Sequence, residues 1–505
     1  MILNIKNRDR ATARFIRRFL DGISINPFFF HIAVVMLLSL STQVWANPAS
    51  VSKNAAASER SVAGNARMRI VWVQDMGDGR DVFAQGTSLR LMGLDTGDGQ
   101  GERVICGTPR NYAKPLITPP GNRVVFTDRS LKKIYVVNWD GSGLRELFGG
   151  VGLVLWRDPQ DGREWMYYGP EEGEKGAEYC PVVYRTLLDS PGAGELIWNR
   201  TRVSVNSFQL SEDGRMAGGL FPWPDGGVAQ LPNRSMKLYA KGCWTSITSV
   251  QGKYFFWIFD GAHRNLTLVN QENERKWQVR INGAPGIDGH EVYHPRWSNH
   301  HRIMTMTGPY KVGLGANRIA GGGPAVEIYV GRFNAGLTKI ESWWRVTTND
   351  QADFFPDVWV ASAEGAKQNP VKVSSSKKAK TVPAFADPGK AIAPRKTIKR
   401  VVVEARLTDL SGVPTPQDIA PYKCALLVNG YEVVRVVSGS YRRKKIMAAH
   451  WVIEDGRVHR DAKREKGKIY RMVLERYDDH PELEGERLIM DSDEFKLRLY
   501  YELRN

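Results

Sequence analysis

The stretch Lys114-Pro-Leu-Ile-Thr-Pro-Pro-Gly-Asn-Arg-Val-Val-Phe126 has the pattern of a strand, a tight turn and a second strand. The stretch Lys133-Ile-Tyr-Val-Val-Asn-Trp-Asp-Gly-Ser-Gly-Leu-Arg-Glu-Leu147 continues with a third strand, an Asp-Gly turn and a fourth strand. Pro-Gly and Asp-Gly pairs between runs of β-branched residues are strong hairpin signals. Residues 114–150 therefore predict one antiparallel unit of four strands.

Partial copies of this unit recur at intervals of roughly 40–50 residues, which is the period of a propeller blade. Four-stranded units repeated at this period close radially into a β-propeller, which leaves few free sheet edges. We predict an all-β protein with a propeller of about six blades over residues 67–360, in which strand 68–73 completes the last blade. The copies begin near Trp156, Phe208, Trp244 and His294, with a half-unit at 352–360.

A second, smaller β-domain is predicted after a linker. Residues 361–396 are rich in Lys, Ala, Pro and Ser and nearly free of aromatic residues, which is typical of a disordered basic linker. Alternating strand patterns return over residues 397–505 and predict a β-sandwich or an OB-like barrel of five or six strands. The run 431–439 resembles the strand and basic turn of netrin-type, OB-like modules.

The N-terminal residues have the layout of a secretory signal peptide. A basic stretch precedes the apolar run 27–40, and Val44 and Ala46 occupy the small-residue positions of a cleavage site. We predict a signal peptide over 1–46, cut after Ala46, and a flexible leader over 47–66. The alternative is an uncleaved anchor, although a membrane span needs about 20 apolar residues. The predicted location is periplasmic or secreted, with no membrane span after cleavage.

The chain is basic, with a net charge of +17 at pH 7. Residues 1–46 hold six basic and two acidic residues, which leaves about +13 on the rest of the chain. On an exported protein, this charge favours acidic polysaccharide, peptidoglycan or anionic lipid as a partner over nucleic acid. The alternative is a basic surface without a dedicated partner.

The four cysteines include no Cys-x-x-Cys pair, so a zinc ribbon or a thioredoxin-like site has no support. Export permits one disulfide, for which Cys106–Cys180 is the candidate. Four buried free thiols are the alternative.

One family resemblance follows from residues 114–150. They match the pattern P-x-x-S-P-D-G-x-x-I-x-F followed by I-Y-V-x-x-x-D-G-S, with Pro119-Pro120-Gly121 in place of Ser-Pro-Asp-Gly. By this pattern the region 67–360 resembles the exported WD-repeat-like propellers of the TolB type. The resemblance implies the propeller fold and leaves the function open, because propellers host binding, scaffolding and catalysis alike.

Five histidines gather between residues 263 and 301. His290 and His294 share one face of a strand, so both imidazoles could point into the propeller channel. Neutral imidazoles near a carboxylate such as Glu291 are a normal transition-metal shell. His263, His290 and His294 are therefore candidate metal ligands; the alternative is that these histidines form hydrogen bonds between blades.

The segment 288–301 also resembles the H-E-x-W-x-P-D-G blade of oligogalacturonate lyases, which use manganese and a general base to cleave pectic oligosaccharides. The resemblance implies that His290, Glu291 and His294 lie in an active-site blade as metal ligands or base. That family takes further histidines from a motif whose counterpart here, 351–356, has none. The acidic stretch 478–486 is a candidate Ca²⁺ site, with a solvated turn as the alternative.

Tryptophans recur along the propeller and suggest a surface for sugar rings. Exposed indoles stack on sugars, and with nearby arginine they would suit an acidic glycan. The alternative is packing between blades, which we expect for most of them. The candidate ligand-binding residues are Trp156, Trp165, Trp223, Trp297 and Arg296.

We predict a non-enzymatic binding or scaffold protein of the cell envelope, which presents the propeller mouth to a glycan or a protein partner. The first alternative is a metal-dependent lyase of acidic, uronate-containing polysaccharide. The second is a TolB-like component of an envelope protein complex. The sequence has no Gly-x-Ser-x-Gly elbow and no phosphate-binding loop, which argues against serine hydrolases and P-loop enzymes.

Overall fold

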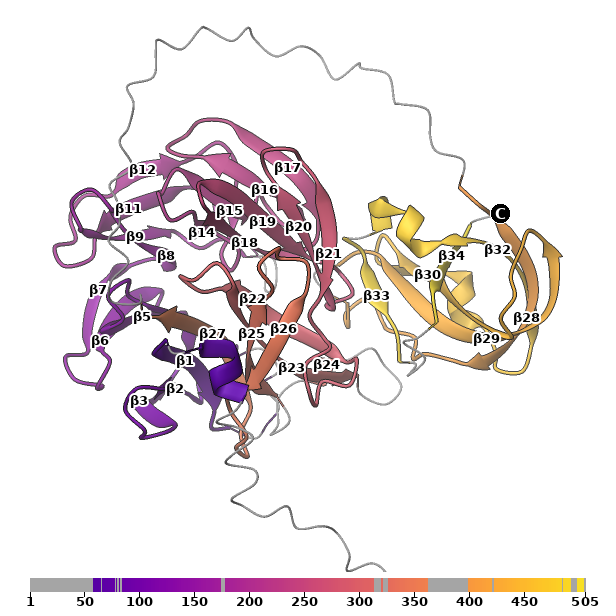
Figure 1. The fold of residues 1–505 in the computed structure, drawn as a ribbon, viewed down its shortest axis with the longest axis horizontal. Helices are drawn as coiled ribbons and strands as arrows, with labels where there is room; N and C mark the ends of the chain where they lie inside the picture. Colours follow the sequence, from indigo (N-terminus) through magenta and orange to yellow (C-terminus); the bar gives the residue numbers. More distant parts are fainter. Residues whose placement is uncertain are drawn as a thin grey trace, which may run out of the picture. The chain divides into compact units, whose positions relative to one another are not determined.

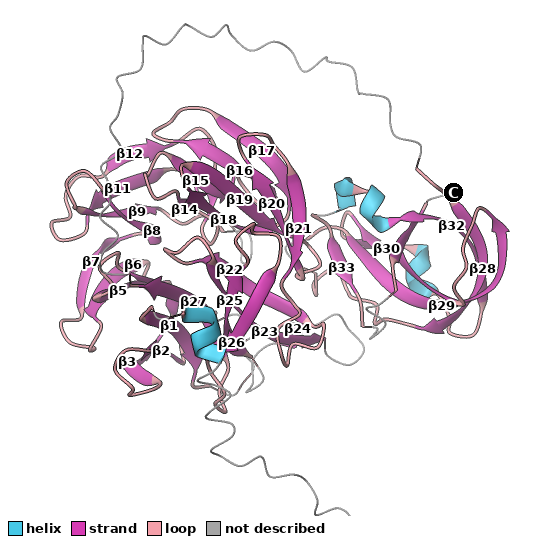
Figure 2. Ribbon diagram, viewed as in Figure 1, coloured by secondary structure: helices cyan, strands magenta, loops and turns pink. Residues whose placement is uncertain are grey.

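β-Strands make up nearly all of the regular structure in the computed structural model of the chain (Figure 2). The structure describes residues 58–361 and 398–503, apart from 65, 78, 80, 82–83, 174–177, 313–318, 321–325, 420–421, 484 and 492–496. The predicted signal peptide and, except for residue 361, the predicted linker lie outside the described residues. Within these ranges no helix is long and apolar enough to cross a membrane.

Six four-stranded antiparallel sheets form the blades of a propeller, which confirms the predicted fold class (Figure 1). Strands pair in chain order within each blade, except that blade one also contains the last strand of the propeller sequence. Blade one contains β27 (Asp353–Val360), β1 (Met68–Asp75), β2 (Leu89–Asp95) and β3 (Arg103–Arg110); blade two contains β4 (Tyr112–Ile117), β5 (Arg123–Asp128), β6 (Lys133–Asn138) and β7 (Arg145–Gly149); blade three contains β8 (Val151–Arg157), β9 (Glu164–Gly169), β11 (Val183–Leu187) and β12 (Glu195–Trp198).

The remaining blades follow the same plan. Two short additions lie outside the four-stranded pattern: β10 (Tyr179–Cys180) pairs with β13 (Val203–Ser204), and β24 (Ile319–Ala320) pairs with β23. Blade four contains β14 (Gln209–Leu210), β15 (Met216–Leu220), β16 (Asp225–Gln230) and β17 (Met236–Lys241); blade five contains β18 (Cys243–Val250), β19 (Lys253–Phe259), β20 (Asn265–Asn270) and β21 (Lys276–Arg280); blade six contains β22 (Glu291–Trp297), β23 (Ile303–Val312), β25 (Glu327–Phe333) and β26 (Ile340–Arg345).

The ring closes where β27 pairs with β1, as predicted from strand 68–73. Asp353, at the start of β27, is fully buried. Its Oδ1 accepts hydrogen bonds from Trp72 Nε1 at 2.7 Å and from Gln74 Nε2 at 2.9 Å, both on β1. Its Oδ2 accepts a third from Asn349 at 3.0 Å. One carboxyl group therefore fastens the last strand of the propeller to the first.

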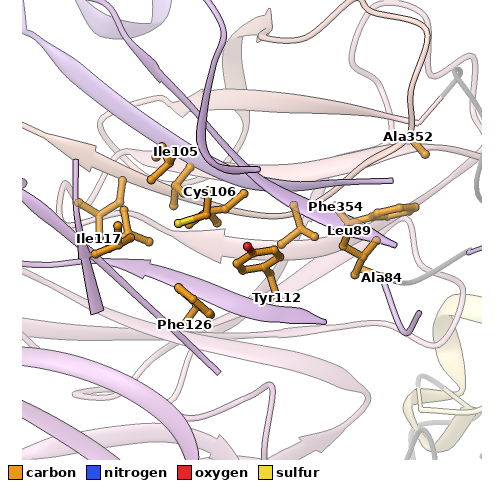
Figure 3. Packing of buried hydrophobic residues seen from close by; sticks show 14 of the residues in the cluster. Ala84, Leu89, Ile105, Cys106, Tyr112, Ile117, Phe126, Ala352 and Phe354 are labelled. Atoms are coloured by element: carbon orange, nitrogen blue, oxygen red, sulfur yellow. The ribbon is translucent and has the colours of Figure 1, made fainter. Parts of the chain in front are cut away.

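Each interface between neighbouring blades contains its own cluster of buried apolar side chains. Figure 3 shows part of the cluster between blades one and two, where Phe354 and Leu89 face Tyr112 and Phe126. The rings of Tyr112 and Phe126 are 4.8 Å apart. Because the strands bury side chains on both faces, the blades stack as successive layers around the ring.

Tryptophan side chains also clasp neighbouring blades at the hairpin turns. Trp156 of blade three donates its indole N–H to Glu212 O in blade four at 2.9 Å, and its ring covers Gly214. Trp359 of blade one does the same to blade two, with Pro119 O at 2.8 Å and its ring over Gly121. A Cβ on either glycine would lie 2.6 Å from the indole, so both turns require glycine.

The predicted flexible leader is wrong for its last part. Residues 58–63 are helical, and Val62 is fully buried against blades one and six. Arg332 of blade six donates a hydrogen bond to Val62 O at 2.8 Å. An apolar side chain and a backbone carbonyl therefore tie this segment to the propeller.

The C-terminal domain is a closed barrel, which decides between the two architectures predicted for residues 397–505. The pairing order β30-β34-β32-β28-β29 returns to β30 and closes a five-stranded ring. The barrel strands are β28 (Val401–Asp409), β29 (Ala425–Ser438), β30 (Lys445–Glu454), β32 (Ile469–Arg476) and β34 (Leu499–Glu502), with β31 (Arg457–Val458) and β33 (Arg487–Ile489) as additions and η1 (Arg460–Lys463), η2 (Tyr477–Asp479) and η3 (Pro481–Leu483) as 3₁₀ turns.

All four cysteines are free thiols, and three of them are buried. The candidate disulfide Cys106–Cys180 is wrong because Cys106 lies on β3 of blade one and Cys180 on β10, beside blade three. Blade two lies between them. Burial raises the pKa of the Cys180 thiol to about 12, as expected for a packing residue.

Candidate functional site

Four side chains converge on the propeller channel from equivalent positions of four blades. Lys114, Trp244, His294 and Phe355 adopt left-handed backbone conformations, with φ of 41°, 23°, 53° and 48°. Each lies within the first four residues of a strand and at an interruption of the register with the next strand. A β-bulge re-aims the side chain that it carries.

Proline explains three of these four bulges. Pro115, Pro295 and Pro356 follow Lys114, His294 and Phe355 directly. Proline has no backbone N–H for the ladder, so strands accommodate it at bulges or edges. Lys114, Trp244 and Phe355 were not among the predicted site residues. For Lys114 and Phe355 the signal was a proline in the same place of blades six, one and two, which are neighbours around the ring.

These side chains line a small cavity, which we call the channel cavity. Its volume is about 20 Å³, which is room for about one water molecule. Because the four residues lie near the beginnings of their strands, the cavity lies toward the corresponding mouth of the channel. The other lining residues are Asn206, Gln209, Thr245, Pro295, Arg296 and Pro356.

Two basic side chains, Lys114 and Arg296, line the channel cavity. Lys114 is buried and donates a hydrogen bond to Val205 O at 3.1 Å. Two effects lower the pKa of Lys114 well below its ordinary value: burial is the larger, and the nearby Arg296 guanidinium is the second. The Arg296 Nε lies 3.5 Å from Asp357 Oδ1, and Asp357 Oδ2 accepts a hydrogen bond from Ile117 N. The long Arg296–Asp357 distance leaves this guanidinium suited to a second acceptor.

His294 is buried beside aromatic rings. Its Nδ1 lies 3.0 Å from Thr307 Oγ1, and its ring centroid lies 4.0 Å from that of Phe355 and 5.4 Å from that of Trp244. Burial lowers the pKa of His294 to about 3, so the imidazole is neutral at physiological pH.

The depressed pKa of His294 predicts a specific acid sensitivity. Unfolded histidine titrates near pH 6.5, so below that pH the unfolded chain binds a proton that the folded chain excludes. Stability therefore falls as pH decreases, by at most about 1.4 kcal/mol per pH unit from this group. We expect His294→Gln to flatten the loss of unfolding free energy between about pH 6.5 and pH 4, measured by urea denaturation. Burial also lowers the pKa of half-buried His301, so His301→Gln should flatten the slope as well, but less than His294→Gln; an unchanged slope in His294→Gln would contradict the assignment.

A second cluster joins the propeller to the C-terminal barrel. Arg487, the first residue of β33, is buried, and its Nη1 lies 2.9 Å from Glu291 Oε1. His263 Nδ1 lies 3.2 Å from Glu291 Oε2, and Tyr293 donates to the same oxygen at 2.9 Å. Tyr422 contacts Cys243 and His263 from the barrel side. We use the name interdomain ion pair for Arg487 and Glu291 together with the side chains around them, which are His263, Tyr293, Tyr422 and Cys243.

The titration of these groups follows from their partners. Burial alone would raise the pKa of Glu291, but the Arg487 guanidinium holds it well below its usual range. Burial also disfavours protonated His263, whereas hydrogen bonds to Cys243 and Glu291 outweigh burial and raise its pKa. Glu291 is therefore an ionised partner of Arg487.

The candidate metal ligands are not brought together. His263 belongs to the interdomain ion pair, His294 lies in the channel cavity, and half-buried His290 precedes β22. The bulge at His294 removes the strand alternation on which a shared face depended. Among the described residues, no group of three or more His, Cys, Asp or Glu side chains is arranged to hold a metal ion, so these residues do not fit manganese.

The acidic stretch 478–486 does not fit Ca²⁺ either, within the part that the structure describes. Two of its carboxylates have basic partners. Asp478 pairs with Arg476 at 3.3 Å, and Glu482 with His480 at 2.8 Å.

The candidate sugar-binding residues are dispersed. Trp156 clasps the next blade, and Trp297 is buried 5.8 Å from Trp257. Trp223 meets Tyr422 edge-on at 5.0 Å. The guanidinium groups of Arg163 and Arg185 both lie over the ring of Trp165. Arg296 alone of the five lines the channel cavity.

Comparison with solved structures finds TolB-type propellers. TolB from Acinetobacter baumannii is 14% identical with a TM-score of 0.38, over 57% of this chain and 66% of that chain. A putative TolB from Agrobacterium tumefaciens is 11% identical with a TM-score of 0.34, over 59% and 100%. AztD from Citrobacter koseri is 12% identical with a TM-score of 0.33, over 59% and 99%. No family model and no curated protein matches the chain.

These values describe a likeness of fold at low identity. The strand pairing of the chain itself confirms the predicted propeller fold.

Proposed function

We propose that this protein is an exported binding or scaffold protein of the cell envelope, which presents the mouth of its propeller to a carboxylate on a glycan or a protein partner. The observation that carries the proposal is the convergence of four left-handed inner-strand residues on the channel cavity. Strain of this kind costs of order 1–3 kcal/mol per residue and clusters at functional sites.

The size and charge of the channel cavity support a carboxylate as the group recognised. A cavity of about 20 Å³ admits one oxygen of a carboxylate, while the rest of that group and of the partner stays outside the cavity. An approaching carboxylate would favour the ammonium form of Lys114, and would accept hydrogen bonds from Arg296. Trp244 and Phe355 add apolar surface beside these cations.

We propose binding rather than lyase chemistry because His263, His290 and His294 occupy three different settings. The envelope location rests on the signal-peptide pattern of residues 1–46. N-terminal sequencing of protein recovered from the periplasm or medium tests it: Asn47 as the first residue supports export, and an intact Met1 would contradict it.

Titration calorimetry tests the binding proposal. We expect a galacturonate oligomer or a carboxylate-bearing envelope protein to bind the wild type, and Arg296→Met to weaken binding about tenfold or more. Arg296→Lys should retain part of the affinity, and exposed Arg275→Met should retain all of it. A galacturonate titration and a pull-down from envelope extract separate the two partner classes. Equal binding by Arg296→Met and wild type would overturn the proposal.

A further inference from the structure

The C-terminal barrel contains a polar cavity of its own, separate from the channel cavity. Its volume is about 340 Å³, within the range of small-ligand pockets, which is about 300–1,000 Å³. It opens beside β30, η1 and β34, and we call it the barrel cavity. Its lining residues are His450, Trp451, Glu454, His459, Arg460, Asp461, Arg464, Arg471, Glu502 and Leu503.

The floor of the barrel cavity is a closed ring of hydrogen bonds. Arg464 donates to Tyr431 Oη at 3.0 Å and to Glu502 Oε2 at 2.7 Å. His450 Nε2 lies 2.7 Å from Tyr431 Oη, and its Nδ1 bonds to Glu502. With neutral His450, Tyr431 donates to Nε2 and Nδ1–H donates to the carboxylate, so each hydrogen bond of the ring joins a donor to an acceptor. The buried Nε–H of Arg464 lies outside the ring and has no hydrogen-bond partner among the residues that the structure describes.

This floor is rigid and balanced in charge. His450 is 1% exposed and Arg464 8%, which fixes both side chains by burial. Burial lowers the pKa of His450 despite the hydrogen bond to Glu502, so the imidazole is neutral. The charges of Arg464 and Glu502 cancel one another, so the charge of a ligand must be matched by residues at the rim of the cavity.

The rim combines two exposed arginines with hydrogen-bond acceptors. Arg460 and Arg471 are exposed, and guanidinium groups bind carboxylates in a bidentate geometry. Glu454 and Asp461 lie near His459, at 3.9 and 3.2 Å from its ring nitrogens. Half-buried Trp451 adds an indole surface, oriented by its N–H bond to Tyr501 Oη at 3.0 Å.

We propose that the barrel cavity binds a sugar unit that carries a carboxylate. Arg460 and Arg471 take the carboxylate, Glu454 and Asp461 accept hydrogen bonds from ring hydroxyls, and Trp451 stacks on the ring. A phosphate or sulfate fits less well, because three carboxylates line the cavity and a multiply charged anion without donors would be repelled. The inference uses no residue of the channel cavity, so the two proposals can fail separately.

Calorimetric titration of the full protein tests the inference, with trigalacturonate, neutral galactotriose, acetate and inorganic phosphate as probes. We expect trigalacturonate to bind, galactotriose and acetate to bind at least about tenfold more weakly, and phosphate not to compete. The Arg460→Met/Arg471→Met double variant should lose about 10- to 100-fold in affinity for trigalacturonate. The Lys counterpart should recover part of that loss.

Two control variants locate the effect. Arg457→Met removes an exposed arginine outside the cavity and should bind as the wild type does. Arg296→Met tests the channel cavity, so a loss there with none in the Arg460/Arg471 double variant would place binding at the propeller and overturn the inference. Trp451→Phe should bind better than Trp451→Ala at equal thermal stability. Equal affinity for phosphate would reduce the site to an adventitious anion site and overturn it as well.

Discussion

Glu291→Gln is expected to lower the free energy of unfolding by about 3–5 kcal/mol. The change leaves the Arg487 guanidinium buried without its counter-charge, and an unpaired buried cation costs far more than the pair contributes. Arg487 and Glu291 are both buried, at a side-chain exposure of 3% and 2%. Urea denaturation followed by circular dichroism measures the loss, and separate transitions for propeller and barrel would also indicate that the domains have uncoupled.

A double variant distinguishes an ion pair from a general loss of packing. Replacing both partners with apolar residues, Glu291→Leu and Arg487→Met, should recover most of the stability, because apolar replacements of buried pairs are often neutral. Glu274→Gln removes one partner of the exposed pair with Lys237 and should cost less than about 1 kcal/mol. Equal losses in Glu291→Gln and Glu274→Gln would contradict the burial argument.

Asp353→Ala is expected to cost about 3–4 kcal/mol of unfolding free energy. The variant leaves the buried donors Trp72 Nε1 and Gln74 Nε2 without their acceptor, and each such donor costs about 1–3 kcal/mol. The loss falls where β27 closes the ring on β1, so hydrogen exchange of β1 amides should increase more than that of blade four.

Asp353→Asn is the matched control. Its carbonyl oxygen can replace Oδ1 as the acceptor for both Trp72 and Gln74, while its amide meets the Asn349 amide that donates to Oδ2. We expect a loss of about 1 kcal/mol, smaller than that of Asp353→Ala. Similar losses in both variants would mean that shape, and not hydrogen-bond acceptance, matters at this position.

The five histidines between residues 263 and 301 show why the roles of site residues could not be predicted from the sequence. His263 and Arg487 are 224 positions apart, and the partner of Glu291 comes from the other domain. Strand alternation placed His290 and His294 on one face, but the bulge at His294–Pro295 broke that alternation. The role of Trp156 could not be predicted for a similar reason, because its ring faces Gly214, which is 58 positions further along the chain and belongs to the next blade.

Local pattern was enough to predict the architecture of the propeller, whereas the choice between sandwich and barrel for residues 397–505 needed the structure. Hairpin turns and β-branched runs depend on neighbouring residues, and they recur with a period of about 40–50 residues. Residues 114–150 and their partial copies were therefore enough to predict the blades, and strand 68–73 was enough to predict the ring closure. The role of each polar side chain was decided only by tertiary structure. Burial and long-range partners set the charge of Glu291 and the neutrality of His294, because an ionisable group responds to the dielectric and charges around it in space. The separation of the two cavities was likewise decided by the tertiary structure.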